Sequence, residues 1–331
     1  MAKLSLLELV RVTQETGARG ALNNARALAV EAEAFGYNRI WVAEHHNMPG
    51  IASAATSLVL AHMAEGTRTI RVGAGGIMLP NHAPYVIAEQ FGTLAQLYPG
   101  RIDLGLGRAP GTDRGTLRAL RRTVDAADTF PDDILELQEY FAPATVDQRI
   151  VAVPAAGTDV PLWILGSSTY GAKLAAELGL PYAFASHFAP DALSEALHIY
   201  RSHFVPSVQL QAPYAMVGVN VIAAETDEEA KRLATTQQMS FTNMLRGKRG
   251  LSQPPIDDIE AYWSPLEKEH AMSMLRRSIV GSVDTVRAGV ESLLKETQAD
   301  ELIIVSDVYD HAARVKSIRL IAEAAGIHAA A

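Results

Sequence analysis

Short apolar runs recur along the whole chain, separated by segments with helical spacing. The runs are KLSLLEL, RIWVA, IRVGAGGIML, RIDLGLG, PLWIL, YAFAS, AMVGVNVIA and ELIIVS. Continuous apolar runs of this length are typical of parallel strands that are buried on both faces. The intervening segments, such as ALNNARALAVEAEAFG from Ala21, contain good helix formers, and several end on glycine. Strands and helices that alternate eight times predict an α/β fold, the (β/α)8 TIM barrel, with a doubly wound sheet as the alternative.

No linker, low-complexity tract or change of composition divides the chain, so we expect one domain over residues 1–331. Two stretches exceed the minimal strand-and-helix repeat. Residues 111–160 contain the helical segment DDILELQEYF and a predicted hairpin around RIVAV, and residues 247–281 are rich in proline and polar residues. Insertions of this length are usually functional loops, so we expect both at the carboxyl ends of the strands, with 247–281 as a candidate lid.

Composition excludes several classes of function. The chain has no cysteine, which excludes disulfides, thiolate metal ligands and thiol nucleophiles. A formal net charge of -8 argues against a nucleic-acid partner, since such proteins usually carry a basic face. Glu8 and Arg11 interrupt the first apolar stretch before a signal-peptide core is complete. No run reaches the roughly 18 apolar residues of a membrane span, so we expect a cytoplasmic protein without a membrane partner.

The second apolar run ends in an unusual group of polar residues, EHHN. Active-site residues of barrels lie at the carboxyl ends of the strands. Because alternate side chains of a strand point to opposite faces, we expect His45 to face the barrel mouth with Trp41, while Glu44 and His46 point away. The other interpretation is a hydrogen-bonded structural pair. No metal site is predicted, because adjacent ligands project apart and no HExxH spacing is present.

The third and fourth runs end in glycine-rich stretches. Gly75 and Gly76 remove side chains where the backbone reaches the mouth, either to admit a flat ligand or to form a bulge. The stretch GLGRAPGTD matches a dinucleotide-binding GxGxxG only in part, because Pro110 takes the place of the third glycine and the strand is not the first. Arg108 is a cation suited to a phosphate oxygen, or else a member of a surface ion pair.

The fifth run leads through Gly166, Ser167 and Ser168 into a predicted helix. Free backbone N–H groups and the positive end of the helix dipole favour a phosphate there. Ordinary capping of the helix by Ser168 or Thr169 explains the composition equally well. Taken together, the glycines, the arginine and the hydroxyl-rich helix start predict a site for a flat ring with a phosphate tail, such as a mononucleotide flavin.

Several of these stretches resemble the bacterial luciferase-like flavin-dependent monooxygenase superfamily, over essentially the whole chain. The resemblance is carried by WVAEHHNMPGIASAATS, by IRVGAGGIMLPNHAPYVIAEQFGTLAQLYPGRIDLGLGRAPGTD, by PLWILGSS and by the segment from SIVGSVDTV onward. It implies a TIM barrel that binds FMN, reduced by a separate NAD(P)H:flavin reductase, and that forms a homodimer. It also implies that a C4a-peroxyflavin transfers one oxygen atom from O2 to a small organic substrate.

The resemblance implies roles for particular residues. Glu44 and His45 match the family's catalytic positions, with His45 beside the reactive edge of the flavin. A cis peptide bond is implied between Gly75 and Gly76. The implied cofactor contacts are Gly75, Gly76, Arg108, Gly166, Ser167 and Tyr170. Gly107 stands where luciferase catalytic chains have a cysteine, which argues against light emission.

Two alternatives stay open. One is a deazaflavin-dependent oxidoreductase that transfers hydride and needs no oxygen. The other is a non-catalytic flavin-binding partner subunit, against which the retained His45 and Arg108 argue. The dimer interface is expected on the first helices, residues 21–35 and 53–64. The substrate is expected to meet a mostly apolar mouth, with Trp41, Met78, His187 and Phe188 as its lining.

Overall fold

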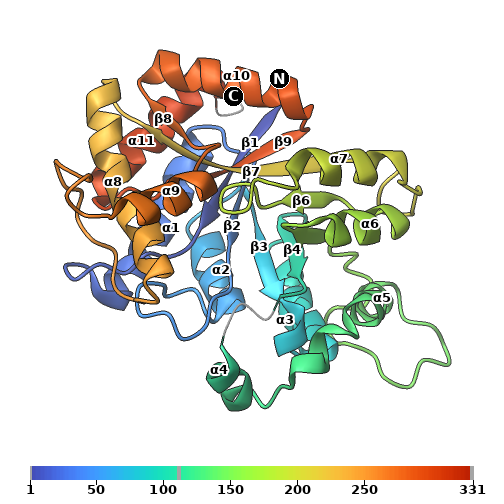
Figure 1. Ribbon diagram of the computed structural model, residues 1–331. Coiled ribbons are helices and arrows are strands. Elements are labelled where there is room, and N and C mark those ends of the chain that lie inside the picture. The colour runs from blue at the N-terminus through green and yellow to red at the C-terminus, as the bar shows by residue number, and fades with distance from the viewer. Residues whose placement is uncertain (1, 110–112, 329–331) are drawn as a thin grey trace.

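The computed structural model describes residues 2–109 and 113–328, and eight parallel strands close into a barrel at its centre (Figure 1). The barrel strands are β1 (Lys3–Glu8), β2 (Arg39–Val42), β3 (Arg71–Met78), β4 (Ile102–Gly107), β5 (Leu162–Gly166), β6 (Tyr182–Phe184), β7 (Ala215–Ala223) and β9 (Glu301–Val305). They pair in sequence order, β6 pairs with β7, and β9 lies between β7 and β1. The predicted TIM barrel is confirmed, and each of the eight apolar runs contains one strand.

One further strand, β8 (Ile279–Gly281), has no counterpart among the predicted runs. It pairs with β7 at Val221–Ala223, beyond the residues of β7 that pair with β6. Three residues are too few to produce a recognisable apolar period.

Helices surround the barrel in Figure 1. They are α1 (Gly17–Ala34), α2 (Thr56–Glu65), α3 (Pro84–Leu97), α6 (Thr169–Glu177), α7 (Leu193–Ser202), α8 (Asp227–Leu245), α10 (Val283–Thr297) and α11 (His311–Ala325). Each buries one stripe against the strands. In α1 the buried residues Ala21, Ala25, Leu28 and Ala32 recur at intervals of three and four, which is the spacing of one helix face.

Large and small side chains alternate inside the barrel. Its interior cluster consists of Leu7, Trp41, Ala43, Trp163, Ala183, Met216, Ile303 and Val305. Trp41 occupies the space left by two glycines of β3, since a Cβ atom on Gly75 would lie 2.9 Å from Cβ of Trp41 and one on Gly73 would lie 2.8 Å from Nε1. The register between β3 and β4 shifts between Gly75 and Ile77, in agreement with the predicted bulge, and the Gly75–Gly76 bond is cis.

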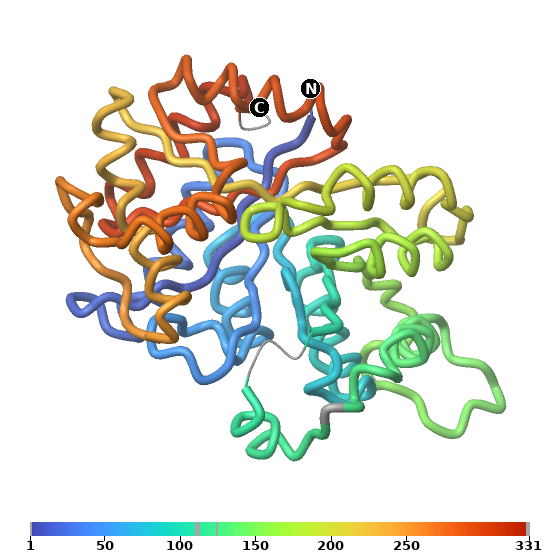
Figure 2. The backbone as a smooth tube through the Cα atoms, viewed as in Figure 1, coloured from blue at the N-terminus to red at the C-terminus, as the bar shows by residue number. Residues whose placement is uncertain are grey.

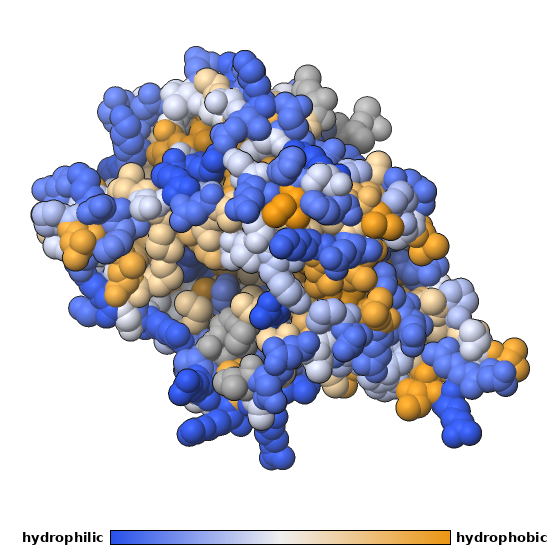
Figure 3. Space-filling model, turned by 45° about the vertical axis from the view of Figure 1, so that its right-hand side comes forward, coloured by the Kyte–Doolittle hydropathy of each residue, from blue (hydrophilic) through white to orange (hydrophobic). Residues whose placement is uncertain are grey.

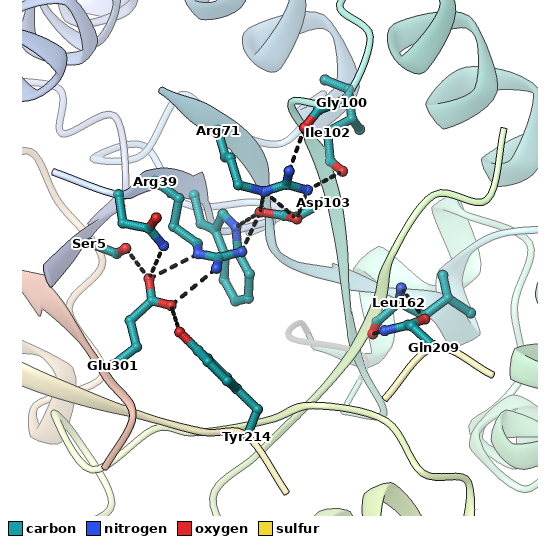
Figure 4. A network of polar contacts seen from close by, with 12 residues as sticks. Ser5, Arg39, Arg71, Gly100, Ile102, Asp103, Leu162, Gln209, Tyr214 and Glu301 are labelled. Carbon is teal, nitrogen blue, oxygen red and sulfur yellow. Dashed lines mark hydrogen bonds and ion pairs between the residues drawn. The ribbon is translucent and has the colours of Figure 1, made fainter. Parts of the chain in front are cut away.

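Buried charged side chains close the amino-terminal end of the barrel (Figure 4). The Arg39 guanidinium donates to Asp103 at 2.7 Å and to Glu301 at 2.9 Å. Tyr214 Oη donates to the second oxygen of Glu301 at 2.8 Å, and Trp41 Nε1 donates to Asp103 at 3.1 Å. Because this network fills the amino-terminal end, the space for a ligand lies at the carboxyl end.

The long connection after β4 contains α4 (Arg114–Ala119), the 3-10 helix η2 (Val124–Ala127) and α5 (Phe130–Phe141); residues 110–112 lie outside the described part. No strand occurs in residues 142–161, so the predicted hairpin around 149–153 is wrong. This segment packs on α3 instead, where a Cβ atom on Gly92 would lie 2.3 Å from Cα of Ala155. The second long connection contains α9 (Pro265–Met274), which begins with a capping box between Ser264 and Glu267.

Candidate active site

A cavity of about 960 Å³ opens at the carboxyl ends of the strands. Its walls come from the ends of the barrel strands, from α8 and from residues 247–253. The surface in Figure 3 is hollowed, with hydrophobic and weakly polar side chains around the hollow. A volume of this size is at the upper end of the range for ligand pockets, so it suits a cofactor together with a small substrate.

His45 lies in the wall of this cavity, as the alternation of side chains along β2 predicts. Trp41, Ala43 and His45 all line it. Burial, and next the charge of the nearby Arg11, lowers the pKa of His45 to about 4. His45 is therefore uncharged at neutral pH, when an imidazole can both donate and accept a proton.

Glu44 points away from the cavity and is completely buried. Its carboxylate Oε1 lies 2.7 Å from Nε2 of His46 and 2.9 Å from Nε2 of His82, and Oε2 accepts a 3.0 Å hydrogen bond from the Met78 backbone. Burial raises the pKa of Glu44, but the hydrogen bonds from His46 and His82 outweigh it and lower the pKa to about 2. Glu44 is thus placed to position the strand end behind His45, without lining the cavity itself.

Glu44, His46 and His82 also form a group that can hold a metal ion, because their ligand atoms lie within 4.8 Å of one another. Spacing along the sequence missed this group, since His82 comes from the turn after the 3-10 helix η1 (Leu79–Asn81). The hydrogen bonds already satisfy the carboxylate. The absence of a metal stays a prediction.

Residues suited to a phosphate meet on another side of the cavity. Arg108, Gly166, Ser167, Ser168 and Tyr170 all line it. The guanidinium carbon of Arg108 lies 4.2 Å from the centroid of the Tyr170 ring. Ser168 is the N-cap residue of α6, yet its side chain makes no capping hydrogen bond, so the first N–H groups of the helix have no side-chain cap. This arrangement favours the phosphate interpretation over ordinary capping.

The cis Gly75–Gly76 unit forms another part of the wall, next to Met78. Neither glycine brings a side chain into the cavity, so a flat ring can lie against the backbone. Gly107 lines the same region, and a Cβ atom there would lie 3.0 Å from Sδ of Met78. Pro110, which argued against a dinucleotide fingerprint, lies outside the described residues.

Residues 247–253 line the cavity, and the orange segment that contains them runs beside the blue segment after β1 in Figure 2. A backbone hydrogen bond joins this segment to the loop after β1, since Ser252 N–H donates to the Val12 carbonyl at 2.9 Å. Val12 N–H in turn donates to the Gly50 carbonyl, in the loop after β2, at 3.0 Å. The proposed lid thus rests on the loops that follow β1 and β2. Farther along the predicted insertion, Met274 at the end of α9 also lines the cavity.

Among the polar residues of the wall that were not predicted are Arg11, Asn220 and Gln237. Arg11 follows the end of β1 and pairs with the buried Asp307 at 2.8 Å. Asn220 on β7 accepts a hydrogen bond from Nε2 of Gln237 at 2.8 Å. The rule that site residues lie at the carboxyl ends of strands could have found Arg11, which follows β1, and Asn220, in the carboxyl-terminal half of β7, whereas Gln237 lies within α8 and carries no such signal.

The part of the chain that the structure describes contains no helix long and apolar enough to cross a membrane.

Known proteins resemble this chain over nearly its whole length. A luciferase-like monooxygenase of Escherichia coli K12 is 50% identical over 317 residues, which cover 96% of this chain and 95% of that protein. The N-acetyl-S-alkylcysteine monooxygenase of Bacillus subtilis is 29% identical over 332 residues, with 98% of each chain covered.

Solved structures share the fold. Apo-MsnO8 superposes with a TM-score of 0.91 at 35% identity, over 99% of both chains. The oxygenating constituent of 3,6-diketocamphane monooxygenase from Pseudomonas putida, in complex with FMN, superposes with a TM-score of 0.73 at 19% identity. The match covers 99% of this chain and 98% of that chain. An F420-dependent secondary alcohol dehydrogenase gives 0.72 at 14% identity over 98% of each chain. The last two likenesses show the fold alone.

The family model of luciferase-like monooxygenases matches residues 3–301, which is most of the chain. This protein belongs to the luciferase-like monooxygenase family.

Proposed function

We propose that the protein is a two-component monooxygenase that binds reduced FMN and inserts one oxygen atom from O2 into a small organic substrate. The observation that carries the proposal is the meeting, in one cavity, of an uncharged imidazole, a wall of glycine backbone and a cationic helix start. These are the features that a proton donor, a flat ring and a phosphate each require.

The residues present fit a flavin mononucleotide. Arg108 and the N-terminus of α6, with Gly166 and Ser167, would hold the phosphate, as an arginine and a helix start commonly do. The Gly75–Gly76 backbone would lie against the ring. Tyr170 keeps the Arg108 guanidinium in place by a cation–π contact.

Reduced flavin, when bound, is the group that would react with molecular oxygen. The chain's own contribution is to exclude water and to manage protons. Apolar side chains such as Trp41, Ile303 and Val305 line the inner cavity, which limits access of water to it. Uncharged His45 donates a proton to, or accepts one from, the reacting oxygen, and Glu44 acts as a positioning residue through His46.

Two further parts of the proposal rest on the family. A separate NAD(P)H:flavin reductase would deliver the reduced flavin, and two copies of the chain would form a homodimer through α1 and α2. The surface of α2 carries Leu58 with 72% of its area exposed, and Val30 of α1 is also exposed. Exposed apolar side chains of this kind are suited to a subunit interface.

The test is to load the protein with reduced FMN without oxygen, mix it rapidly with oxygenated buffer, and follow the return of the oxidised flavin absorbance. Reoxidation slower than that of free FMN supports the proposal. Reoxidation at the rate of free FMN contradicts it. If FMN does not bind but the deazaflavin F420 does, hydride transfer replaces oxygenation as the function. FMN that binds but reoxidises like free FMN favours the non-catalytic flavin-binding subunit.

The role of His45 has its own test in the same assay. His45→Gln should bind FMN within about threefold of the wild type but should lose most of the protection from reoxidation. His198→Gln is the matched control, since His198 is exposed on α7 outside the cavity. Unchanged protection in His45→Gln would contradict the assigned role.

A further inference from the structure

His187 follows β6 and lines the same cavity as His45, which follows β2. In the order of the barrel, β2 and β6 are four strands apart, so they lie on opposite sides of the axis. The two imidazoles therefore enter the mouth from opposite walls. They are near enough that His45 contributes to the lowered pKa of His187.

A glycine on the neighbouring strand brings the His187 ring inward. Side chains of β7 alternate, so Met216, Gly218 and Asn220 face the barrel interior. A Cβ atom on Gly218 would lie 2.5 Å from Nδ1 of His187, which no side chain tolerates. The ring thus occupies the position that any other residue at 218 would fill.

The residues around His187 hold it in place but leave its nitrogens unused. Asn220 Nδ2 donates to the His187 carbonyl at 2.5 Å, and Asn220 is itself held by Gln237. The ring of Phe188 stands nearly perpendicular to the His187 ring, with the centroids 4.9 Å apart. Neither ring nitrogen has a hydrogen-bond partner among the described residues, and Nδ1 is buried. Nδ1 is enclosed beside Gly218, so Nε2, which is not buried, is the nitrogen that a molecule in the cavity can reach and hydrogen-bond.

Burial, with a smaller contribution from His45, lowers the pKa of His187 to about 4. At neutral pH the ring is uncharged, with one nitrogen that donates and one that accepts. Such a ring suits a carbonyl or hydroxyl group. The cavity wall is mostly apolar and includes Phe188, Phe241 and Met244, so it suits the hydrocarbon part of the same molecule.

We propose that His187 is a further residue of the reaction site, which hydrogen-bonds an uncharged carbonyl or hydroxyl group of the organic substrate from the wall opposite His45. This inference rests on the proposed function, and it assigns different roles to the two histidines of the site. His45 serves the flavin and oxygen side, and His187 holds the substrate. The substrate class is an uncharged oxygen-bearing compound with an apolar body.

The experiment compares three probes of similar shape: acetophenone, 1-phenylethanol and cumene. Each is titrated into the FMN-loaded protein, and binding is followed by NMR of Cε1-labelled histidines, with the His187 signal assigned by its loss in His187→Gln. The wild type should bind the ketone and the alcohol about threefold to tenfold more tightly than the hydrocarbon, which is the range for one uncharged hydrogen bond. Both oxygen-bearing probes should shift the His187 signal.

His187→Phe should remove this preference and leave cumene binding unchanged, whereas His187→Gln should restore part of it, because an amide still donates and accepts. Gly218→Ala, which displaces the ring, should act like His187→Phe. His198→Gln is the control. A preference that persists in His187→Phe, or a wild type without any preference, overturns the inference.

Folding and flavin binding are measured separately. Circular dichroism and flavin absorbance of each variant show whether a lost preference reflects an unfolded or flavin-free protein. If the wild type fails to bind FMN, the proposed function fails, and the same titration without flavin still decides whether His187 binds the probes.

Discussion

His46 Nε2 lies 2.7 Å from Oε1 of Glu44, so the residue after His45 is tied to a buried carboxylate. Glu44→Gln replaces one acceptor oxygen by a donor that faces other donors. We expect the free energy of unfolding to fall by about 1–3 kcal/mol, the usual cost of an unsatisfied buried polar group. Urea denaturation measures this change.

The control for Glu44→Gln is Glu225→Gln. Glu225 forms an exposed ion pair with Lys316 at 3.0 Å, so its replacement should change the stability by no more than about 0.5 kcal/mol. Equal losses in the two variants would show that the Glu44 hydrogen bonds contribute nothing specific.

Arg108 beside the start of α6 predicts that the phosphate of FMN is recognised. The wild type should bind FMN more tightly than riboflavin, and Arg108→Gln should weaken FMN binding about tenfold to a hundredfold, as expected for a charged hydrogen bond. Riboflavin binding should not change. Flavin fluorescence titration gives both constants. Arg287→Gln, on the exposed surface of α10, is the control; a parallel loss of riboflavin affinity would contradict a phosphate contact.

Burial of His45 and His187 predicts a pH-dependent stability. Both have a folded pKa of about 4, below the ordinary value of 6.5, so the unfolded chain takes up protons first as the pH falls. Their contribution is complete above about pH 6.5 and is lost toward pH 4. The Glu44 contribution, with a pKa lowered to about 2, is lost only below about pH 4.5.

Between about pH 7.5 and about pH 5 the Glu44 contribution does not change, so comparing one histidine variant with the wild type reports on that histidine. His187→Gln should lose about 2 kcal/mol less stability across this interval than the wild type does. Urea denaturation at both pH values measures the difference. Identical losses in variant and wild type would mean that His187 is protonated as readily in the folded protein as in the unfolded chain.

The group formed by Glu44, His46 and His82 predicts how the protein responds to removal of metal ions by a chelator. Because hydrogen bonds satisfy this group, prolonged treatment with a strong chelator should leave the melting temperature and the flavin reoxidation rate unchanged. Elemental analysis of the purified protein is the companion measurement. A stoichiometric metal whose removal lowers the melting temperature would show that the three side chains are ligands.

Exposed Leu58 on α2 predicts where a homodimer would form. Leu58→Asp should shift the protein from dimer to monomer, since a carboxylate would be buried without a partner at the interface. Sedimentation velocity reports the change. Val208→Asp is the control, because Val208 is fully exposed and lies between β6 and β7 rather than on the first helices. A monomeric wild type contradicts the proposal.

The barrel could be predicted from local patterns. Eight continuous apolar runs separated by helical segments leave few folds that bury every run on both faces. The two-residue period of β2 was enough to separate His45, which faces the cavity, from Glu44, which does not. The hairpin around residues 149–153 failed because the segment is held on α3, where Tyr85 Oη donates to the Val151 carbonyl at 3.2 Å, while Ile150 and Val153 stay exposed.

Much of the site depended on contacts between distant residues. His82 joins Glu44 from another strand end, Ser252 is held by Val12, and His187 turns inward because residue 218 is a glycine. The sequence by itself determined which side chains each strand end presents, because that depends on short-range periodicity. Only the tertiary structure decided which strand ends meet and which polar atoms are left without a partner, because both depend on how the closed barrel packs.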